Sequence, residues 1–228
     1  MTGVAMSVFK DRRDAGRQLA VPLQRYASER PVVVALPRGG VPVGYEVARA
    51  LGAPLDIMVV RKLGAPGQPE LGIGAVVDGD HPERVLNDDV VRLLDVSAEY
   101  LRGEIECQLA EIHRRQQAYR GGRPPVGVAG RTAIVVDDGL ATGASMRAAL
   151  RGLRRAGPRR LVLAVPVAPT ETLATLAAEA DDVVCLSTPS PFGAVGYFYD
   201  DFEQTDDVEV VALLESARAT VPDALPTA

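Results

Sequence analysis

Two adjacent carboxylates end an apolar run in the middle of the chain, and a Thr-Gly-Ala-Ser segment follows them. Residues 133–136 are Ala-Ile-Val-Val, which predicts a buried parallel strand. Asp137 and Asp138 come directly after it, where open α/β sheets bind their ligands. Carboxylates accept hydrogen bonds from vicinal hydroxyls, and the free amides at a helix start bind phosphate. This order of residues therefore suits a phosphorylated sugar.

The segment after the carboxylates has the composition of a phosphate-binding turn. Gly139 and Gly143 permit close approaches that a side chain would prevent, and Thr142 and Ser145 add hydroxyl groups. Residues 146–156 are helix-forming, so their amino end carries unpaired amides and a partial positive charge. A simpler interpretation is an acidic turn in which Ser or Thr caps the helix. Two aspartates followed by Thr-Gly-Ala-Ser favour the phosphate site over that interpretation.

A second glycine turn follows an earlier apolar run, residues 32–36. It contains Pro37, Arg38, Gly39 and Gly40 in sequence. Exposed glycine amides and the fork of guanidinium donors suit phosphate oxygens. Taken alone, the pattern fits an ordinary turn with a solvated arginine equally well.

A third segment is a predicted strand that ends in two cations. Residues 57–62 end in Arg61 and Lys62, and residues 63–70 are dense in Gly and Pro. Such a loop is typically mobile and able to close over a site. Alternatively, Arg61 and Lys62 are simply the charged end of a strand and have no role in binding.

The fourth segment gathers aromatic residues in a chain that is only 4% aromatic. Residues 189–202 contain Phe192, then Val195, Gly196 and Tyr197 in a row, and then Asp200. The alternative to a binding loop here is a small aromatic core beneath a loop.

Together these motifs resemble the type I phosphoribosyltransferases over residues 32–202, the family's signature being an apolar strand, two acidic residues and Thr-Gly-x-Thr/Ser. The resemblance implies that Asp137 and Asp138 hold the ribose hydroxyls of phosphoribosyl pyrophosphate (PRPP) and are the catalytic pair. It further implies pyrophosphate binding by the first loop, often through a non-proline cis peptide. The implied 5′-phosphate ligands are Ala141, Thr142, Gly143, Ala144 and Ser145, and the implied pyrophosphate ligands are Arg38, Gly39, Arg61 and Lys62.

The resemblance also implies an acceptor site and a metal. Phe192, Val195 and Tyr197 would bind the base, with Phe192 stacking on it although it is offset by one position from the family's aromatic. Magnesium would be the cofactor, supported by Asp137, Asp138 and Asp200, and Glu70 would lie near the site. Enzymes for 6-oxopurines carry a lysine just after the strand that follows the PRPP motif. Residues 161–169 contain no lysine, so the acceptor stays open.

The implied activity is transfer of the 5-phosphoribosyl group of PRPP to a nucleobase-like acceptor with release of pyrophosphate. Two alternatives stay open. The chain would bind PRPP or a nucleotide as a regulatory module without catalysis, because fold does not fix function. Otherwise it would act on another phosphorylated sugar.

Composition excludes several other classes. The chain has 228 residues, 47% hydrophobic and 24% charged, which is typical of a soluble globular protein. Its net charge of −5 argues against a nucleic-acid-binding surface. Cys107 and Cys185 are expected to be free thiols, and with His81 and His113 they make no zinc pattern. Residues 1–10 lack the apolar stretch of a signal peptide and no run suits a membrane span, so a cytoplasmic protein is expected.

These motifs must be positioned by alternating strands and helices. Such alternation predicts an α/β fold with a doubly wound, mostly parallel sheet flanked by helices, and the resemblance adds a small hood over it. We expect one domain, residues 1–228, with its core at about 28–205 and a helix with a frayed tail at 206–228. A homodimer is compatible with the long helix. Strands are predicted at residues 32–36, 57–62, 72–77, 84–86, 133–136, 161–167 and 183–186, and helices at 12–26, 42–51, 89–119, 146–156, 170–180 and 208–218.

Overall fold

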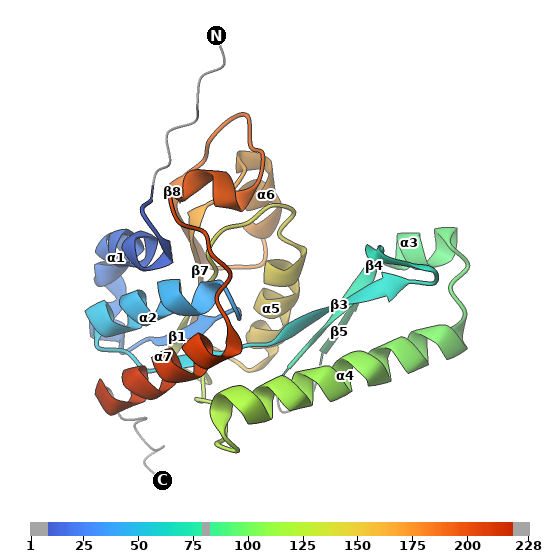
Figure 1. The fold of residues 1–228 in the computed structure, drawn as a ribbon, viewed down its shortest axis with the longest axis horizontal. Helices are drawn as coiled ribbons and strands as arrows, with labels where there is room; N and C mark the ends of the chain where they lie inside the picture. The colour runs from blue at the N-terminus through green and yellow to red at the C-terminus, as the bar shows by residue number, and fades with distance from the viewer. Residues whose placement is uncertain (1–8, 79–82, 221–228) are drawn as a thin grey trace.

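The computed structural model describes residues 9–78 and 83–220, except for the side chains of Glu70 and Glu83. Its centre is a five-stranded sheet in the order β2-β1-β6-β7-β8, in which all neighbours are parallel (Figure 1). The predicted doubly wound sheet is therefore confirmed. Its strands are β1 (Val32–Ala35), β2 (Leu55–Ile57), β6 (Thr132–Val136), β7 (Arg160–Val167) and β8 (Asp182–Ser187).

Helices cover both faces of this sheet, which explains why its inner strands are almost continuous apolar runs. Consecutive residues of β1 point to opposite faces of the sheet: Val33 belongs to the apolar cluster on one face, and Val34 belongs to the cluster on the other. Two helices, α5 (Ala144–Arg155) and α6 (Thr170–Leu176), pack on one face. The other face is covered by α1 (Arg12–Leu23), the 3₁₀ helix η1 (Gln24–Glu29), α2 (Gly40–Leu51) and α7 (Asp207–Thr220).

The order of the strands reverses between β1 and β6, which creates a switch point of the kind where open α/β sheets bind ligands. Ala35 pairs with Val136 at the end of the two strands. The segment Arg38-Gly39 and the pair Asp137-Asp138 each follow directly, at the same edge of the sheet. Two motifs that lie about a hundred residues apart in the sequence are therefore neighbours in the fold.

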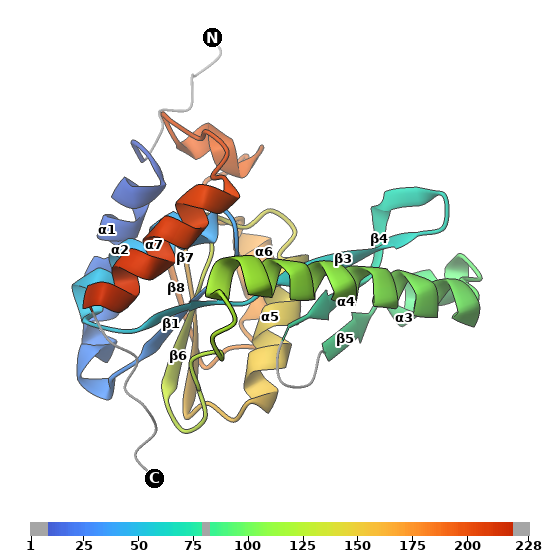
Figure 2. The same ribbon diagram turned by 60° about the horizontal axis from the view of Figure 1, so that its bottom comes forward.

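A second unit projects from the core, and we call it the arm (Figures 1 and 2). It consists of a three-stranded antiparallel sheet in the order β3-β4-β5 together with two helices. The longer helix runs alongside the sheet in both views. The elements of the arm are β3 (Val60–Ala65), β4 (Gln68–Val77), β5 (Glu83–Leu86), α3 (Asp88–Leu93) and α4 (Ala98–Arg120).

Three of the predicted elements differ in the arm. The predicted strand 57–62 is wrong, because β2 ends at Ile57 in the core sheet and β3 begins at Val60 in the arm sheet. Residues 63–70, predicted as a loop, form most of the β3–β4 hairpin. The predicted helix 89–119 is two helices, because Asp95 has a φ of 46° and Ser97 begins a new helix by accepting a hydrogen bond from the Tyr100 amide at 3.2 Å.

A buried ion cluster joins the arm to the core. Arg120, the last residue of α4, donates to Asp56 of β2 at 3.0 Å and to Asp78, just after β4, at 3.4 Å. It also donates to the Ile57 carbonyl at 2.6 Å, and Asp56 accepts the Val126 amide at 2.8 Å. All three charged side chains are almost fully buried. One arginine thus connects core strand, arm strand and arm helix.

The hood is residues 188–206, at the top of Figure 1 near β8. Its aromatic side chains pack on Phe9 at the start of the described chain, with the Phe9 and Tyr199 rings 5.3 Å apart. The helix predicted at 208–218 is confirmed as α7. The predicted frayed tail, 221–228, and His81 lie outside the described residues. None of the helices in residues 9–78 and 83–220 has both the length and the hydropathy that crossing a membrane requires.

Candidate functional site

The acidic pair lies directly against the amino end of α2. A Cβ atom on Gly39 would overlap the Asp138 Oδ2 atom, and one on Gly40 would lie 2.8 Å from the Val136 carbonyl oxygen. Only glycine allows the two segments to approach this closely. The peptide bond between Pro37 and Arg38 is cis, as expected in this loop. The site therefore combines two carboxylates with the amides of a helix start.

Arg12, a residue of α1, contacts the pair from the other side. Its Nε donates to Asp138 Oδ2 at 2.7 Å, and its Nη1 donates to the Glu203 carbonyl at 2.6 Å. The guanidinium carbon lies 3.8 Å from the centre of the Phe202 ring. Tyr199 donates its hydroxyl to the Asp138 carbonyl at 2.5 Å. The hood and α1 together thus fix both the side chain and the backbone of Asp138.

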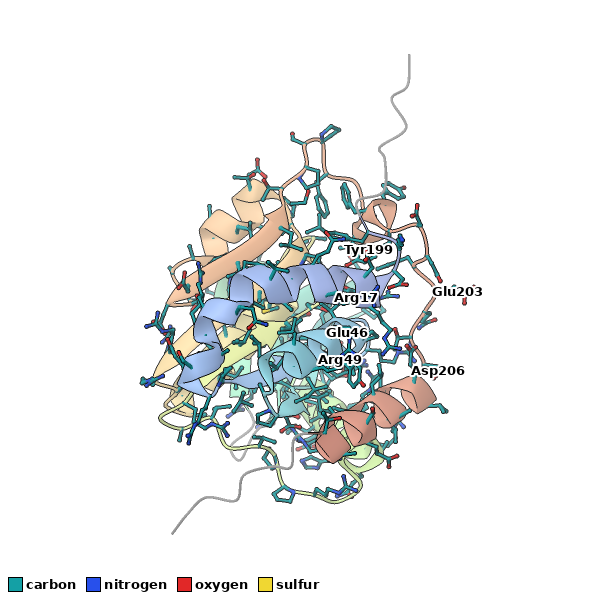
Figure 3. All side chains as sticks on the ribbon, turned by 90° about the vertical axis from the view of Figure 1, so that its left-hand side faces the viewer. Arg17, Glu46, Arg49, Tyr199, Glu203 and Asp206 are labelled. Atoms are coloured by element: carbon teal, nitrogen blue, oxygen red, sulfur yellow. The ribbon has the colours of Figure 1, made fainter. Side chains whose placement is uncertain are left out.

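The close packing of α1 on α2 positions Arg12. A Cβ atom on Gly16 would lie 2.6 Å from the Val43 carbonyl, so the two helices meet backbone to backbone. Beside this contact the buried Glu46 accepts from Arg13 at 2.9 Å and from Arg49 at 2.6 Å. Figure 3 shows Glu46 and Arg49 on α2 beside Arg17 of α1, with Tyr199 above them.

The environment of the two carboxyl groups differs. Burial, and then the neighbouring Asp138, raise the pKa of Asp137 well above its usual value. Burial also raises the pKa of Asp138, but Arg12 opposes that effect. Asp137 Oδ1 accepts only the Asp138 amide, at 2.9 Å, among the hydrogen bonds of the described residues. The pair therefore has one carboxylate held by an arginine and one that favours a proton or a cation.

The predicted phosphate turn leads into α5. Gly143 has a φ of 72°, which favours glycine, and a Cβ atom there would lie 2.8 Å from Thr172. Thr172 donates its hydroxyl to the Ala141 carbonyl at 2.6 Å, which ties α6 to the turn. Thr142 and Ser145 are exposed at the amino end of α5. The turn is thus fixed by its neighbours while its polar groups stay accessible.

Arg38 is oriented by two helices that are distant in sequence. Its Nη1 lies 3.6 Å from Asp207 Oδ1 in α7, and Tyr119 of α4 donates to that same oxygen at 2.6 Å. The hydrogen bond from Tyr119 lowers the pKa of Asp207, and the positive charge of the neighbouring Arg38 lowers it further. Arg38 stays near the site entrance, about one third exposed, at 31%.

The structure separates the two predicted cations of β3. Adjacent residues of a strand point to opposite faces. Arg61 donates to Gln108 of α4 at 2.9 Å, whereas Lys62 lines a cavity together with Thr142 and Ser145. Lys62 therefore lies with the predicted phosphate turn, and Arg61 lies on the face that contacts α4. The side chain of Glu70 lies outside the described residues.

The residues predicted to bind the acceptor all lie in the hood, but their surroundings differ. Val195 contacts Gly139, where a Cβ atom would lie 2.5 Å from its Cγ1 atom. Phe192 packs on Phe198 with ring centres 5.2 Å apart and lines a cavity of 440 Å³ beside Ala141. Tyr197 is 68% exposed, and Asp200 is also exposed.

Asp200 does not join the acidic pair in a three-carboxylate site. Within residues 9–78 and 83–220, no three acidic, His or Cys side chains are grouped closely enough to hold a metal ion. A metal at this site would therefore rest on Asp137 and Asp138 and on oxygen atoms from its ligands.

Arg12, Tyr199 and Phe202 contact the acidic pair or its partner but are not among the site residues predicted from the sequence. Arg12 and Asp138 are 126 positions apart, and nothing in the local sequence of α1 marks this arginine among the several that it contains. The only local signal is the aromatic enrichment of residues 189–202, which includes Tyr199 and Phe202.

Comparisons with known proteins agree with this geometry. A family model described as phosphoribosyl transferase domain matches residues 10–202. Two Mycobacterium tuberculosis proteins, which carry the provisional names phosphoribosyl transferase Rv0571c and MT0597, are 50% identical over 219 residues, or 96% of this chain. The chain spans about half, 49%, of the length of each. The crystal structure of TT1426 from Thermus thermophilus is 48% identical with a TM-score of 0.78, covering 91% of this chain and 98% of that one.

Proposed function

Because this chain belongs to the phosphoribosyl transferase domain family, we propose that it transfers the 5-phosphoribosyl group of PRPP to a nucleobase-like acceptor and releases pyrophosphate. The observation that carries this proposal is the contact between Asp138 and Gly39 at the switch point of the sheet. This contact brings the carboxylate of Asp138, which can bind the two ribose hydroxyls, close to the amino end of α2, which can bind an anion. A phosphorylated, pyrophosphorylated ribose presents both kinds of group.

Each part of PRPP has a matching element. The amino end of α5, with Thr142 and Ser145, would bind the 5′-phosphate through its unpaired amides. Asp137 and Asp138 would accept hydrogen bonds from the ribose hydroxyls. The amino end of α2 and the guanidinium of Arg38 would bind pyrophosphate. The two helix starts would thereby hold the two anionic ends of one molecule.

In the proposed step the bond from C1′ to the pyrophosphate oxygen breaks and a bond from C1′ to an acceptor nitrogen forms. Pyrophosphate leaves with the bonding electron pair, and the acceptor nitrogen loses its proton. Asp137 is the better base of the pair because its pKa is raised well above the usual value by burial and by Asp138. The protein contributes mainly by orienting both partners and by stabilising the charge on pyrophosphate.

The donor set suits magnesium, which prefers carboxylate and phosphate oxygens. Asp137 and Asp138 are hard oxygen ligands, and the raised pKa of Asp137 marks an uncompensated negative charge that a cation would offset. Bound magnesium would neutralise charge on pyrophosphate, with Asp137 and Asp138 holding it directly or through water.

The 440 Å³ cavity in the hood is our candidate for the acceptor site. It is bounded by Ala141 of the phosphate turn, by Thr170 and Glu171 at the start of α6, and by Ser190 and Phe192 of the hood. An acceptor bound in this cavity would lie beside the phosphate turn and so next to the ribose of PRPP. Glu171 is the one charged residue that lines it within the described chain. A carboxylate at this position favours acceptors that donate hydrogen bonds.

The second candidate is a PRPP- or nucleotide-binding regulatory module without catalysis. The same cavity favours it, because its lining within the described residues includes no lysine that would contact a 6-oxo group. The two candidates share the PRPP site and differ in turnover.

Pyrophosphate release from PRPP separates them. We would incubate the protein with PRPP, magnesium and a panel of purine and pyrimidine bases, with Asp137→Asn/Asp138→Asn as the control. Base-dependent release that the double variant lacks supports the transferase. PRPP binding by calorimetry without release for any base favours the regulatory module. An absence of PRPP binding rejects the transferase, and an absence of both PRPP and nucleotide binding rejects the regulatory module.

A further inference from the structure

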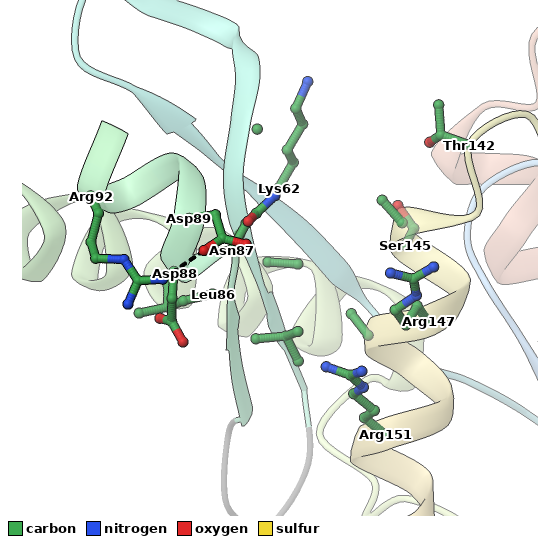
Figure 4. Close-up of a pocket in the computed structure, with 16 residues that line it drawn as sticks. Lys62, Leu86, Asn87, Asp88, Asp89, Arg92, Thr142, Ser145, Arg147 and Arg151 are labelled. Atoms are coloured by element: carbon green, nitrogen blue, oxygen red, sulfur yellow. Dashed lines mark hydrogen bonds and ion pairs between the residues drawn. The ribbon is translucent and has the colours of Figure 1, made fainter. Parts of the chain in front are cut away.

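A large cavity separates α5 from the arm and extends well beyond the phosphate turn. Its volume is 620 Å³, within the range of sites that bind drug-sized or nucleotide-sized molecules. Figure 4 shows it as an open space between α5 and the arm elements β5 and α3, with Thr142 and Ser145 at one end. We call it the α5–arm cavity.

The α5 wall of this cavity carries two arginines one helical turn apart. Arg147 and Arg151 both line the cavity; in Figure 4 the Arg151 guanidinium points from α5 toward the arm, and the Arg147 guanidinium lies along α5 below Ser145. Like charges at positions i and i+4 destabilise a helix. The Glu179 carboxylate, which pairs with Arg151 at 2.6 Å, already offsets part of this repulsion, and an anion bound between the two side chains would offset more of it.

Some of the hydrogen-bond donors of Arg147 and Arg151 have no acceptor among the described residues. The Nε atom of Arg147 is buried and has no hydrogen-bond partner among the described residues. Arg151 uses Nε and Nη2 to contact Glu179, at 2.9 and 2.6 Å, which leaves the donors of Nη1. Because the Nε atom of Arg147 is buried, the donors that Arg147 offers to the cavity are its terminal Nη groups, and phosphate oxygens accept from groups of this kind.

The arm wall has a different character. Arg92 is paired with Asp89 at 2.6 Å, so its charge is balanced within the arm. Asn87 and Asp88 line the cavity beside them and present oxygen acceptors. The cavity is thus cationic on the α5 side, and the arm side presents oxygen acceptors together with the side chain of Lys62. A ligand with phosphate at one end and hydroxyl or amino groups at the other matches both walls.

We propose that the α5–arm cavity is a second binding site, for a nucleoside phosphate whose phosphate group is held by Arg147 and Arg151. This phosphate lies along the side of α5, distinct from the 5′-phosphate of PRPP at the amino end of that helix. Because the ligand contacts both α5 and the arm, its binding fixes the position of the arm relative to the core. The site is therefore suited to regulation of the neighbouring transferase centre.

Calorimetric titration with a panel of nucleoside 5′-mono-, di- and triphosphates tests this site. The test variant is Arg147→Gln/Arg151→Gln. The matched control is Arg154→Gln/Arg155→Gln, which removes the same charge from the same helix and also breaks the ion pair from Arg154 to Asp181 at 2.8 Å. The third protein is Asp137→Asn/Asp138→Asn, which impairs the proposed PRPP site and leaves the cavity unchanged. Thermal unfolding of all variants checks that they are folded.

We expect at least one nucleotide to bind the wild type, the control and the aspartate variant alike, and to bind the Arg147/Arg151 variant about tenfold more weakly or worse. Absence of binding by every nucleotide overturns the proposal. Binding that the aspartate variant loses and the Arg147/Arg151 variant keeps also overturns it, because the nucleotide then occupies the PRPP site. PRPP binding by the Arg147/Arg151 variant tests the proposed PRPP site independently, because this variant leaves Asp137 and Asp138 unchanged.

Discussion

The Nε atom of Arg12 lies 2.7 Å from the Oδ2 atom of Asp138, although the two residues are 126 positions apart in the chain. Both side chains are mostly buried, with exposed fractions of 11% and 15%. The same guanidinium stacks on Phe202. This ion pair joins the first helix, the hood and the acidic pair, so α1 is part of the functional site and not only a cover for the sheet.

Removal of Arg12 should therefore destabilise the protein and impair the site together. In Arg12→Met the Asp138 carboxylate loses its partner in a poorly solvated position, and we expect a loss of about 2–3 kcal/mol in the free energy of unfolding. Urea denaturation measures it. The control is Arg17→Met, whose side chain is 49% exposed and whose pairing should contribute less than about 1 kcal/mol. Equal losses in the two variants would contradict the structural role of Arg12.

The buried Asp137 should lower stability at neutral pH. Its folded pKa is raised by burial and by Asp138, whereas the unfolded pKa is about 3.9. At pH values between the unfolded and the folded pKa, the folded protein binds more protons than the unfolded chain. The free energy of unfolding therefore falls as the pH rises from about 4, and it becomes constant above the folded pKa. Asp137→Asn lacks this dependence and should be more stable at pH 7 by about 1 kcal/mol. Urea denaturation from pH 4 to 8 tests it; parallel curves for the two proteins would refute the prediction.

Gly39 should not tolerate a side chain. A Cβ atom at this position overlaps Asp138 Oδ2, so Gly39→Ala must displace either the loop or the carboxylate. We expect a loss of about 1–3 kcal/mol in stability and loss of PRPP binding. Gly103→Ala in α4 is the matched substitution, because its Cβ has open space, and it should gain about 0.5–1 kcal/mol. Unchanged PRPP affinity in Gly39→Ala would show that this contact is dispensable.

Arg120 should be essential for the attachment of the arm. In Arg120→Met two buried carboxylates, Asp56 and Asp78, lose their common partner, and we expect a loss of about 3–5 kcal/mol in unfolding free energy. Burial already raises the pKa of Asp78 while Arg120 opposes it, so the variant should lose least at acidic pH. Chemical denaturation at pH 5 and 7 measures both effects. Arg114→Met, which removes an exposed ion pair on the same helix, is the control and should leave stability almost unchanged.

The sequence predicts the core strands β1, β6, β7 and β8 because each contains a short apolar run that turn-forming or polar residues follow within a few positions, whereas β2 is missed. The acidic pair and the phosphate turn are predictable for the same reason, since residues 132–146 carry a complete local pattern. Their neighbour Gly39 follows from the rule that parallel strands end at a common edge. This part of the site needs only local sequence and one topological rule.

The remaining features depend on contacts that local patterns do not encode. The change of sheet at Met58-Val59 interrupts a run that is continuously apolar, so periodicity does not mark it. The division of Arg61 from Lys62 follows from strand alternation only once β3 is known to lie between α4 and α5. Arg12 is selected by the packing of α1 on α2 at Gly16 and Glu46, which involves residues far apart in the chain.

The arm leaves the core once, after β2, and returns once, before β6. It is therefore a single insertion between two strands, and its removal would leave the order of the parallel sheet unchanged. The length of such an insertion can change without any change in the order of the core strands, provided that Arg120 keeps its contacts with Asp56 and Asp78. The arm is thus a separate structural module: its size and outer surface can vary independently of the edge of the sheet where β1 and β6 end.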